Sequence, residues 1–271
     1  MSYNNFKPHL ISAKIQTELA LETTLCAWCN TEFEGEVKQG GTVSVIESAK
    51  PTIKTYTGAD LESEYIDTAE GILKITEAKY FDFRVKDIDA AMTKSSLFDQ
   101  HTEDAKRGLA EARDKFVGGL AIGAGKVVAS TEVSTDAGAC ALLDDAILTL
   151  RQNNVPTKIP ICADVPWWYY YKVLKYLIDL DTNNSQFLKT GVLKQYMDLL
   201  IRPTNCLTND GTDDHLMIRT KKAIAFASGF DKVEAYRTEK NFCDGLKGLD
   251  LYGGKVMRPK ELVCIKAHRS A

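Results

Sequence analysis

The sequence predicts an α+β fold, in which helices and strands interleave without the regular alternation of a parallel α/β protein. Two patterns support this fold class. Apolar residues recur every three or four positions in several long segments, as in amphipathic helices, while other short segments alternate apolar and polar residues, as strands do. The 271 residues also contain no internal repeat and no proline- or serine-rich linker, so nothing in the sequence separates two independent domains.

The amino-terminal part predicts an extended arm followed by a helix. The first eight residues are polar and aromatic and end in Pro8, which suits an extended segment. From residue 9 to residue 30 the apolar side chains recur at helical spacing. Gly35 and the Gly40-Gly41 pair then mark the end of this region.

Residues 40–85 predict a long β-hairpin with a wide, polar tip. An isolated two-stranded ribbon is marginally stable at best in water. The segment itself supplies no obvious cover, so a neighbouring copy of the chain is one candidate for its support. The strand-like runs lie at residues 42–46, 53–56, 72–75 and 80–85.

A short helix is expected at residues 87–92, and a longer one at residues 102–128. Glu103 and Asp104 fall in the first turn of the longer helix, where the helix dipole favours negative charge. Each glycine within it costs about 1 kcal/mol relative to alanine, so we expect a bend or a close neighbour there. The glycines are Gly108, Gly118 and Gly119, and the predicted apolar seam is Leu109, Ala112, Phe116 and Leu120.

The remainder of the chain alternates between helix and strand. A helix is predicted from Asp136 to a stop at Asn153-Asn154-Val155-Pro156, with Leu142, Leu143, Ala146, Ile147 and Leu150 on one face. A strand is expected at residues 158–163, and Pro166 suits the first turn of a helix that begins at Trp167. Further strands are expected at residues 197–202, 216–219, 232–237, 249–251, 255–257 and 262–266.

Composition and charge exclude several classes of protein. Hydrophobic residues make up 44% and charged residues 26%, which are ordinary values for a soluble globular chain. No run approaches the roughly 18 apolar residues that span a bilayer, and the start lacks the pattern of a signal peptide. A net charge of −3 argues against a general nucleic-acid binder, which needs a basic patch. The seven cysteines have no framework spacing, which favours reduced, mostly buried thiols.

Two motifs resemble known sites but lack essential parts. Cys26-Ala27-Trp28-Cys29 has the C-x-x-C spacing, yet no second ligand pair accompanies it, as a structural zinc site would need. The stretch from Gly118 to Val127 resembles a phosphate-binding loop. It has Leu120 where that motif needs glycine and Val127 where it needs serine or threonine. Buried thiols and a helix end are the better interpretations.

Two further segments have simpler explanations than a binding site. The aromatic run from Trp167 to Tyr171 lacks the basic groove of a base-stacking platform, so we interpret it as core packing with some interface surface. The oxygen-rich segment 209–215 fails the calcium-loop pattern and is predicted to be a surface loop. The sequence therefore predicts no enzyme, no catalytic residue, no cofactor-binding residue, no cofactor and no metal ligand.

An ordered set of motifs resembles the major capsid proteins of tailed bacteriophages, which have the Hong Kong 97 fold. Each motif is weak alone, but the motifs come from both ends of the chain and occur in the family's order. Near the amino terminus they are Phe33-Glu34-Gly35-Glu36, Gly41-Thr42-Val43 and Tyr80-Phe81-x-Phe83-x-Val85-x-Asp87-Ile88-Asp89. Near the carboxyl terminus they are Ile224-Ala225-Phe226-Ala227, Val233-Glu234-Ala235-Tyr236-Arg237 and Gly248-Leu249-x-Leu251-Tyr252-Gly253-x-Lys255-Val256-x-Arg258-Pro259.

The resemblance implies both an organisation and a function. Residues 1–35 would be an N-terminal arm and residues 36–84 an extended loop that overlaps a neighbouring subunit. Residues 85–130 and 238–271 would form the peripheral domain with its spine helix, and residues 131–237 the axial domain. The chain would assemble in a host cytoplasm, as hexamers and pentamers, into the icosahedral or prolate capsid of a virion.

The resemblance also implies partners. A shell of this kind would enclose double-stranded DNA on its inner face without reading its sequence, would include a portal and would have no membrane. Family-like sequence begins within the first ten residues, which leaves no room for a fused scaffolding domain. We therefore expect a separate scaffolding protein and an arm that no protease removes.

Other interpretations of the sequence remain open. An encapsulin-like shell would have the same fold but would house an enzyme in a cell. A soluble α+β enzyme would form only small oligomers. A single-strand nucleic-acid binder is disfavoured by the negative net charge.

Overall fold

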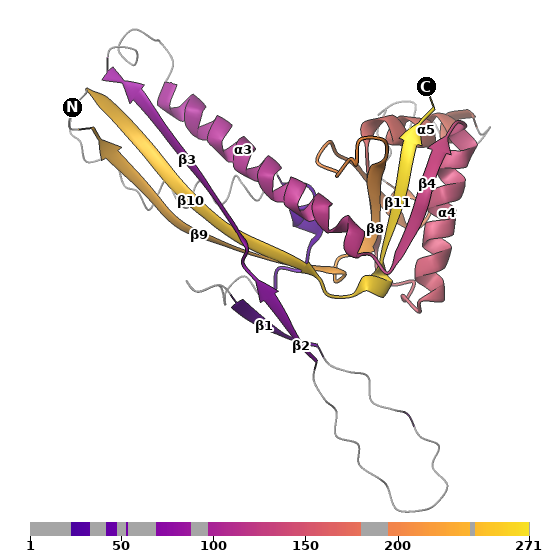
Figure 1. The fold of residues 1–271 in the computed structure, drawn as a ribbon. Coiled ribbons are helices and arrows are strands. Elements are labelled where there is room, and N and C mark those ends of the chain that lie inside the picture. Colours follow the sequence, from indigo (N-terminus) through magenta and orange to yellow (C-terminus); the bar gives the residue numbers. More distant parts are fainter. Residues whose placement is uncertain are drawn as a thin grey trace, which may run out of the picture.

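The computed structural model describes residues 23–32, 42–47, 53, 69–87, 97–179, 195–238 and 242–270. Two sheets and a two-stranded ribbon organise these residues (Figure 1). The helices are η2 (Cys26–Trp28), α3 (Leu97–Gly119), η4 (Leu120–Gly123), α4 (Asp136–Gln152), α5 (Trp167–Asp179) and η5 (Pro259–Glu261), where η denotes a 3₁₀-helix. The strands are β1 (Thr42–Glu47), β2 (Ala69–Lys74), β3 (Glu77–Lys86), β4 (Lys126–Val133), β5 (Ile161–Val165), β6 (Gln195–Tyr196), β7 (Leu199–Pro203), β8 (Asp214–Thr220), β9 (Ile224–Arg237), β10 (Cys243–Val256) and β11 (Leu262–Arg269).

The first sheet has three antiparallel strands in the order β3-β10-β9, and α3 runs along it (Figure 1). Alternate residues of β3 face α3: Phe81 packs against Leu109 and Ala110 of the helix, while Tyr80 on the other face is 78% exposed. This corrects the predicted hairpin. The strand-like run 80–85 is a strand, but it pairs with β10 rather than with the other predicted arm of the hairpin.

The ribbon itself consists of β1 and β2, which pair antiparallel from Thr42 opposite Lys74 to Glu47 opposite Ala69. In Figure 1 it projects away from both sheets, and neither strand belongs to them. The predicted strands at 42–46 and 72–75 are thus confirmed in outline. The predicted strand at 53–56 lies outside the described residues except for Ile53, which is not in a strand and is 96% exposed.

The second sheet has six strands in the order β4-β11-β8-β5-β7-β6. Because side chains alternate along a strand, each face has its own neighbours. Leu216 and Ile218 of β8 belong to the core that also contains residues of α4 and α5. Met217, between them, belongs to a second core with η2 and the end of α3. The central strands are therefore covered on both faces.

The spine helix α3 differs from its prediction at both ends. It begins at Leu97, so its first turn contains Asp99 rather than Glu103. It ends at Gly119, followed by η4 and then β4, and does not continue to residue 128. The expected close neighbour is present, because a Cβ on Gly118 would lie 2.5 Å from the carbonyl oxygen of Cys206. Only glycine fits that approach without a shift of the backbone.

The buried face of α3 is more polar than the predicted seam. Leu109 is buried, but Ala112, Phe116 and Leu120 are only partly so. Arg113 and Asp114 are buried instead. Arg113 forms a bidentate pair with Asp250 of β10, with nitrogen–oxygen distances of 2.7 and 2.5 Å, so its charge is matched where it is buried.

The predictions for helices α4 and α5 are confirmed, whereas the strand between them begins later than predicted. Thr135 caps α4, with its hydroxyl accepting a hydrogen bond from the N–H of Gly138. Asn154, just past the end of α4, has a φ of 63°. Strand β5 begins at Ile161 rather than at residue 158, because Pro160 has no N–H to give to the ladder.

Two expected helices fall mostly outside the described residues. Of the predicted helix 9–30, only residues 23–30 are described, and these contain the single turn η2. Of the predicted helix 87–92, only Asp87 is described. The predicted extended segment at residues 1–8 is not described.

Each of the two sheets contains strands from more than one of the predicted segments. Strand β9 lies within residues 131–237 but pairs with β10 in the three-stranded sheet. Strand β11 lies within residues 238–271 but pairs with β4 and β8 in the six-stranded sheet. The chain therefore passes from one sheet to the other several times.

Candidate assembly elements

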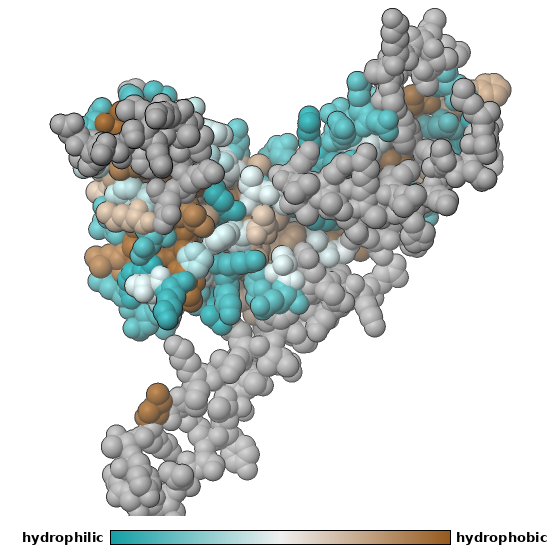
Figure 2. All heavy atoms as spheres, turned by 180° about the vertical axis from the view of Figure 1, so that it is seen from behind, coloured by the Kyte–Doolittle hydropathy of each residue, from teal (hydrophilic) through white to brown (hydrophobic). Residues whose placement is uncertain are grey.

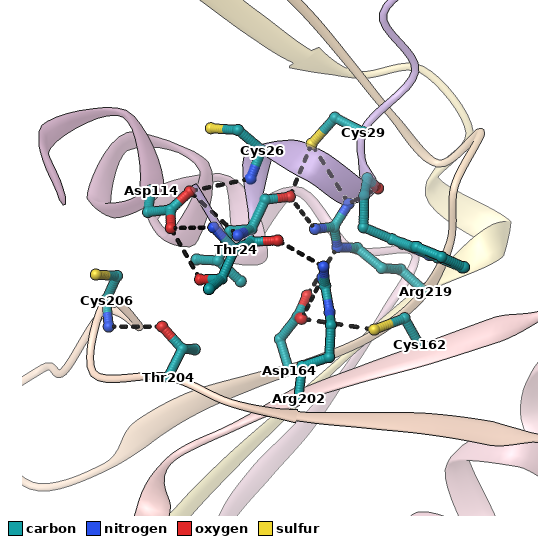
Figure 3. A network of polar contacts seen from close by, with 12 residues as sticks. Thr24, Cys26, Cys29, Asp114, Cys162, Asp164, Arg202, Thr204, Cys206 and Arg219 are labelled. Atoms are coloured by element: carbon teal, nitrogen blue, oxygen red, sulfur yellow. Dashed lines mark hydrogen bonds and ion pairs between the residues drawn. The ribbon is translucent and has the colours of Figure 1, made fainter. Parts of the chain in front are cut away.

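Residues 23–30, which we call the arm root, are held by a buried carboxylate on the spine helix. Asp114 is 3% exposed and accepts hydrogen bonds from the N–H groups of Thr24, Leu25 and Cys26 at 2.7, 3.1 and 3.0 Å. It also accepts one from the Thr24 hydroxyl at 2.8 Å. These amides begin the turn η2 and have no partner within it. Asp114 thus caps a helix that lies far from it in the sequence (Figure 3).

The carbonyl groups of the arm root are held from the other side by two arginines of the six-stranded sheet. Arg219, which is fully buried, donates to the carbonyl oxygens of Leu25 and Trp28 at 2.8 and 2.6 Å. Arg202 donates to the carbonyl oxygen of Thr24. Both arginines also bind the buried carboxylate of Asp164. The two guanidinium groups thus share one buried carboxylate, and their remaining hydrogen bonds to oxygen go to the carbonyl oxygens of the arm root (Figure 3).

The arm root therefore connects the two sheets. One side of it is bound to α3, which lies along the three-stranded sheet, and the other to Arg202 of β7 and Arg219 of β8 in the six-stranded sheet. Beyond η2, Asn30 forms backbone hydrogen bonds with Ile224 and Phe226 of β9 at 2.9 and 3.0 Å. We refer to these contacts together as the arm-root clamp.

The cysteines of the C-x-x-C motif lie within this clamp as buried thiols, as predicted. All seven cysteines are free and six are buried. The Cys29 thiol donates to the carbonyl oxygen of Leu25 at 3.4 Å. Burial raises the pKa of Cys26 well above its ordinary value and also raises that of Cys29, so both stay protonated at neutral pH. Among the described residues no cluster of metal-ligating side chains is found.

The other motifs take the forms that the simpler interpretations predicted. The segment from Gly118 to Val127 runs from helix to strand, the reverse of a phosphate-binding loop. In the turn at 209–215, the carboxylate of Asp210 accepts hydrogen bonds from the N–H groups of Thr212 and Asp213, which lower its pKa. The same carboxylate contacts His215 and Lys266. The carboxylate oxygens of Asp210 are therefore already bonded to donors of the protein itself.

The aromatic run contributes to both core and surface, as predicted. Tyr169 and Tyr170 are buried against α4 and the six-stranded sheet. Trp167 and Tyr171 are 43% and 56% exposed. In the rear view of Figure 2, apolar residues reach the surface of the unit that contains the six-stranded sheet. None of the helices among the described residues is long and apolar enough to cross a bilayer.

The base of the ribbon has a much smaller attachment than the arm root. Leu73 of β2 is fully buried in a small cluster with Ala225, Ala227 and the partly buried Met257. Next to it, a Cβ on Gly253 of β10 would lie 2.2 Å from the carbonyl oxygen of Lys74. The ribbon thus crosses β10 at a point where only glycine allows the two backbones to meet.

Sequence reasoning did not identify the clamp or the ribbon base. Asp114 and Arg219 are polar residues in otherwise ordinary elements, and their partners lie about 90 and 190 residues away. Gly253 belongs to a recognised motif, but its role depends on β2 crossing above it. One feature of the sequence could have indicated the clamp: Arg219 is a charged residue near the end of a strand that is otherwise apolar and buried.

Comparisons with known proteins connect this architecture to viral shells. No family model matches the chain, and no curated protein matches it. A solved structure from Mycobacterium phage Che8 has a TM-score of 0.75 and 27% identity and covers 90% of each chain. The capsid structure of cyanophage P-SCSP1u has a TM-score of 0.73 and 16% identity, covering 92% of this chain and 89% of that one. The mature capsid of bacteriophage PhiM1 has a TM-score of 0.65 and 14% identity, covering 88% and 87%.

Proposed function

We propose that this chain, which has the Hong Kong 97-like fold of phage capsid proteins, is the major capsid protein of a tailed phage. Like the phage proteins with similar structures, it is a structural protein and not an enzyme. The observation that carries the proposal is the likeness over about nine-tenths of both chains, including one at 27% identity. Copies of the chain assemble with one another into a shell.

The parts of the subunit suggest how the shell forms. Residues 1–35 are the arm, and residues 36–76, with the ribbon β1–β2, are the extended loop. The three-stranded sheet with α3 is the peripheral unit, and the six-stranded sheet with α4 and α5 is the axial unit, which packs around five- and six-fold axes. Many modest contacts per copy then give a stable shell through effective concentration.

The outer face of the three-stranded sheet is the contact surface for the extended loop of a neighbouring copy. Tyr80 is exposed there beside a shallow hollow of about 340 Å³ that includes Leu249. Around it, Tyr236 donates to Asp82 at 2.5 Å, and Lys247 pairs with Glu234 at 2.8 Å. An exposed aromatic side chain beside charges that are already paired can be covered without leaving a charge unpartnered.

The further partners follow from the function proposed. The shell would be icosahedral or prolate and would enclose double-stranded DNA without sequence-specific contacts, consistent with a net charge of −3. Assembly would take place in a host cytoplasm with a separate scaffolding protein and a portal. An encapsulin-like shell is the alternative with the same fold, and the contents of purified particles distinguish the two.

Electron microscopy of the purified full-length chain tests the proposal. We expect closed particles of uniform diameter at concentrations where most of the protein sediments rapidly. Particles that contain an enzyme rather than DNA in the native source would favour the encapsulin alternative. A chain that remains a monomer or a small oligomer across the accessible concentration range, with or without its phage's other head proteins, would contradict both.

A further inference from the structure

Helix α5 has a second apolar face that no described part of the chain covers. Its inner face packs Tyr170, Val173 and Leu174 into the core. The outer side chains Trp167, Tyr171, Lys175 and Ile178 are spaced by four, four and three positions, so they form one stripe. Trp167, Tyr171 and Ile178 are 43%, 56% and 41% exposed. Two exposed aromatic residues one turn apart are typical of the centre of a protein interface.

This outer stripe carries positive charge. Tyr171 and Lys175 border a hollow of about 420 Å³ that is also lined by Lys172 and Arg269. Lys172 donates to the carbonyl oxygen of Ser134, but among the described residues no carboxylate forms an ion pair with Lys172, Lys175 or Arg269. Asp136 is the single acidic residue that lines the hollow. We call Trp167, Tyr171, Lys175 and Ile178 the α5 stripe.

A groove of complementary character lies between α4 and the edge strand β4. It has a volume of about 360 Å³, and its lining includes Val128, Leu142, Leu148 and Asp145. Leu148 is 55% exposed, and Asp145 is exposed one turn before it. The described residues hold no cation against the Asp145 carboxylate. Lys126, which also lines the groove, is bound to the hydroxyl of Thr149 at 2.8 Å. We call this surface the α4 groove.

The α5 stripe and the α4 groove are different surfaces of the same unit, because Lys175 lies beside Asp136 at the start of α4, whereas the groove lies along the second half of α4. Helix α4 packs against β4 and β11 at one edge of the six-stranded sheet, and α5 packs against β7 towards the other edge. A contact between two different surfaces of identical subunits is head-to-tail, and it closes into a ring when the rotation permits.

We propose that the α5 stripe of one copy binds the α4 groove of the next copy, with Lys175 facing Asp145. The aromatic side chains would enter the groove beside Leu142 and Leu148, and the opposite charges would set the register. The proposal rests on the capsid function, because it assigns the side chains of the contact that joins axial units. The occupant of each surface is therefore a second copy of this chain.

A charge exchange tests the pairing. Lys175→Glu and Asp145→Lys should each lower the assembled fraction roughly tenfold, because one like-charge contact is repeated around every ring. The double variant K175E/D145K should recover to within about twofold of the unmodified chain. Lys222→Glu, on the turn after β8, and Glu103→Lys, on α3, are the matched charge controls and should assemble normally. Sedimentation and electron microscopy measure the assembled fraction, and thermal unfolding verifies that each subunit is folded.

The outcomes separate this contact from the capsid function itself. If the single variants assemble like the unmodified chain, or if the double variant assembles no better than they do, the pairing is wrong while the capsid function stands. If the unmodified chain forms no shells, the proposed function fails. Lys175→Cys with Asp145→Cys, joined by a short bismaleimide crosslinker that spans the longer reach of a lysine–aspartate pair, supplies a second measurement that does not depend on charge. A ladder of crosslinked oligomers beyond the dimer supports a head-to-tail contact, and crosslinked dimers alone or no crosslink would overturn it.

Discussion

The arm root and the β1–β2 ribbon are both attached to the body of the subunit, but in opposite ways. The arm root is held by buried charged groups from two sheets, which bind both its amides and its carbonyls. Among the contacts that the structure describes, the ribbon is held by the buried Leu73 and by one close backbone crossing at Gly253. Buried hydrogen-bonded charges are costly to disrupt, whereas a single apolar side chain detaches locally. From this comparison we expect the arm-root clamp to stabilise the subunit and the ribbon to become ordered mainly on assembly.

The largest effect should come from Asp114→Ala. The substitution leaves three backbone N–H groups and the Thr24 hydroxyl without an acceptor, so we expect the free energy of unfolding to fall by about 3–5 kcal/mol. Urea unfolding of the unassembled subunit measures this. Glu111→Ala, on an exposed part of the same helix, is the control and should cost about 0.5 kcal/mol or less. Equal losses in the two variants would contradict a stabilising role for the clamp.

Leu73→Ala should act on the ribbon alone. Removal of the buried side chain should weaken the attachment of the ribbon by about 2 kcal/mol, at the low end for a core leucine because the surrounding cluster is small. Hydrogen exchange of β2 amides should accelerate, with little change in the urea midpoint of the subunit. Ile53→Ala, at a side chain that is 96% exposed, should leave both quantities unchanged. A large loss of global stability in L73A would show that the ribbon is part of the subunit core.

Gly253→Ala should move the ribbon without unfolding the subunit. A Cβ would lie 2.2 Å from the carbonyl oxygen of Lys74, so the crossing must open. We expect the assembled fraction to fall several-fold while the thermal midpoint shifts by only a few degrees. Gly108→Ala, where a Cβ would meet nothing within 4 Å, is the control and should assemble normally. Normal assembly of G253A would remove this crossing as a determinant of ribbon position.

Alkaline pH should lower the stability of the subunit through the clamp. Burial raises the pKa of the Cys26 thiol above its ordinary value of 9.0, so the folded state retains a proton that the unfolded state loses. The stabilisation is complete below pH 9 and declines as the pH rises above it, by at most about 1.4 kcal/mol per pH unit for one thiol. Urea unfolding at pH 8, 9 and 10 measures the slope. Cys26→Ala should reduce it, and an unchanged slope would mean that this thiol is not involved.

Sequence reasoning recovered the elements whose pattern is local. The apolar face of α4 repeats at helical spacing, so Leu143 and Leu150 were placed on its buried side, and the start of α5 at Trp167 was predicted from Pro166. The run 80–85 was identified as a strand because its apolar and polar residues alternate. Its partner was not, because alternation defines the faces of a strand but not which strand lies beside it.

The clamp and the contact surfaces could not be predicted because they depend on distant residues. Asp114 and Arg219 meet the arm root only after the chain has folded. The end of α3 at Gly119 reflects the approach of Cys206 to Gly118, which no local pattern encodes. The aromatic run was assigned to core and interface together, but only the structure shows that Tyr170 is buried in the core and that Tyr171 is exposed.

Hydrogen exchange on free subunits and on assembled shells tests the contrast most directly. The amides of Leu25 and Cys26, which bind Asp114, should be protected in both states. The β1–β2 amides should exchange at least tenfold faster in the free subunit than in the shell. Ribbon amides that are equally protected in a stable free monomer would contradict the account, because the ribbon would then need no second copy.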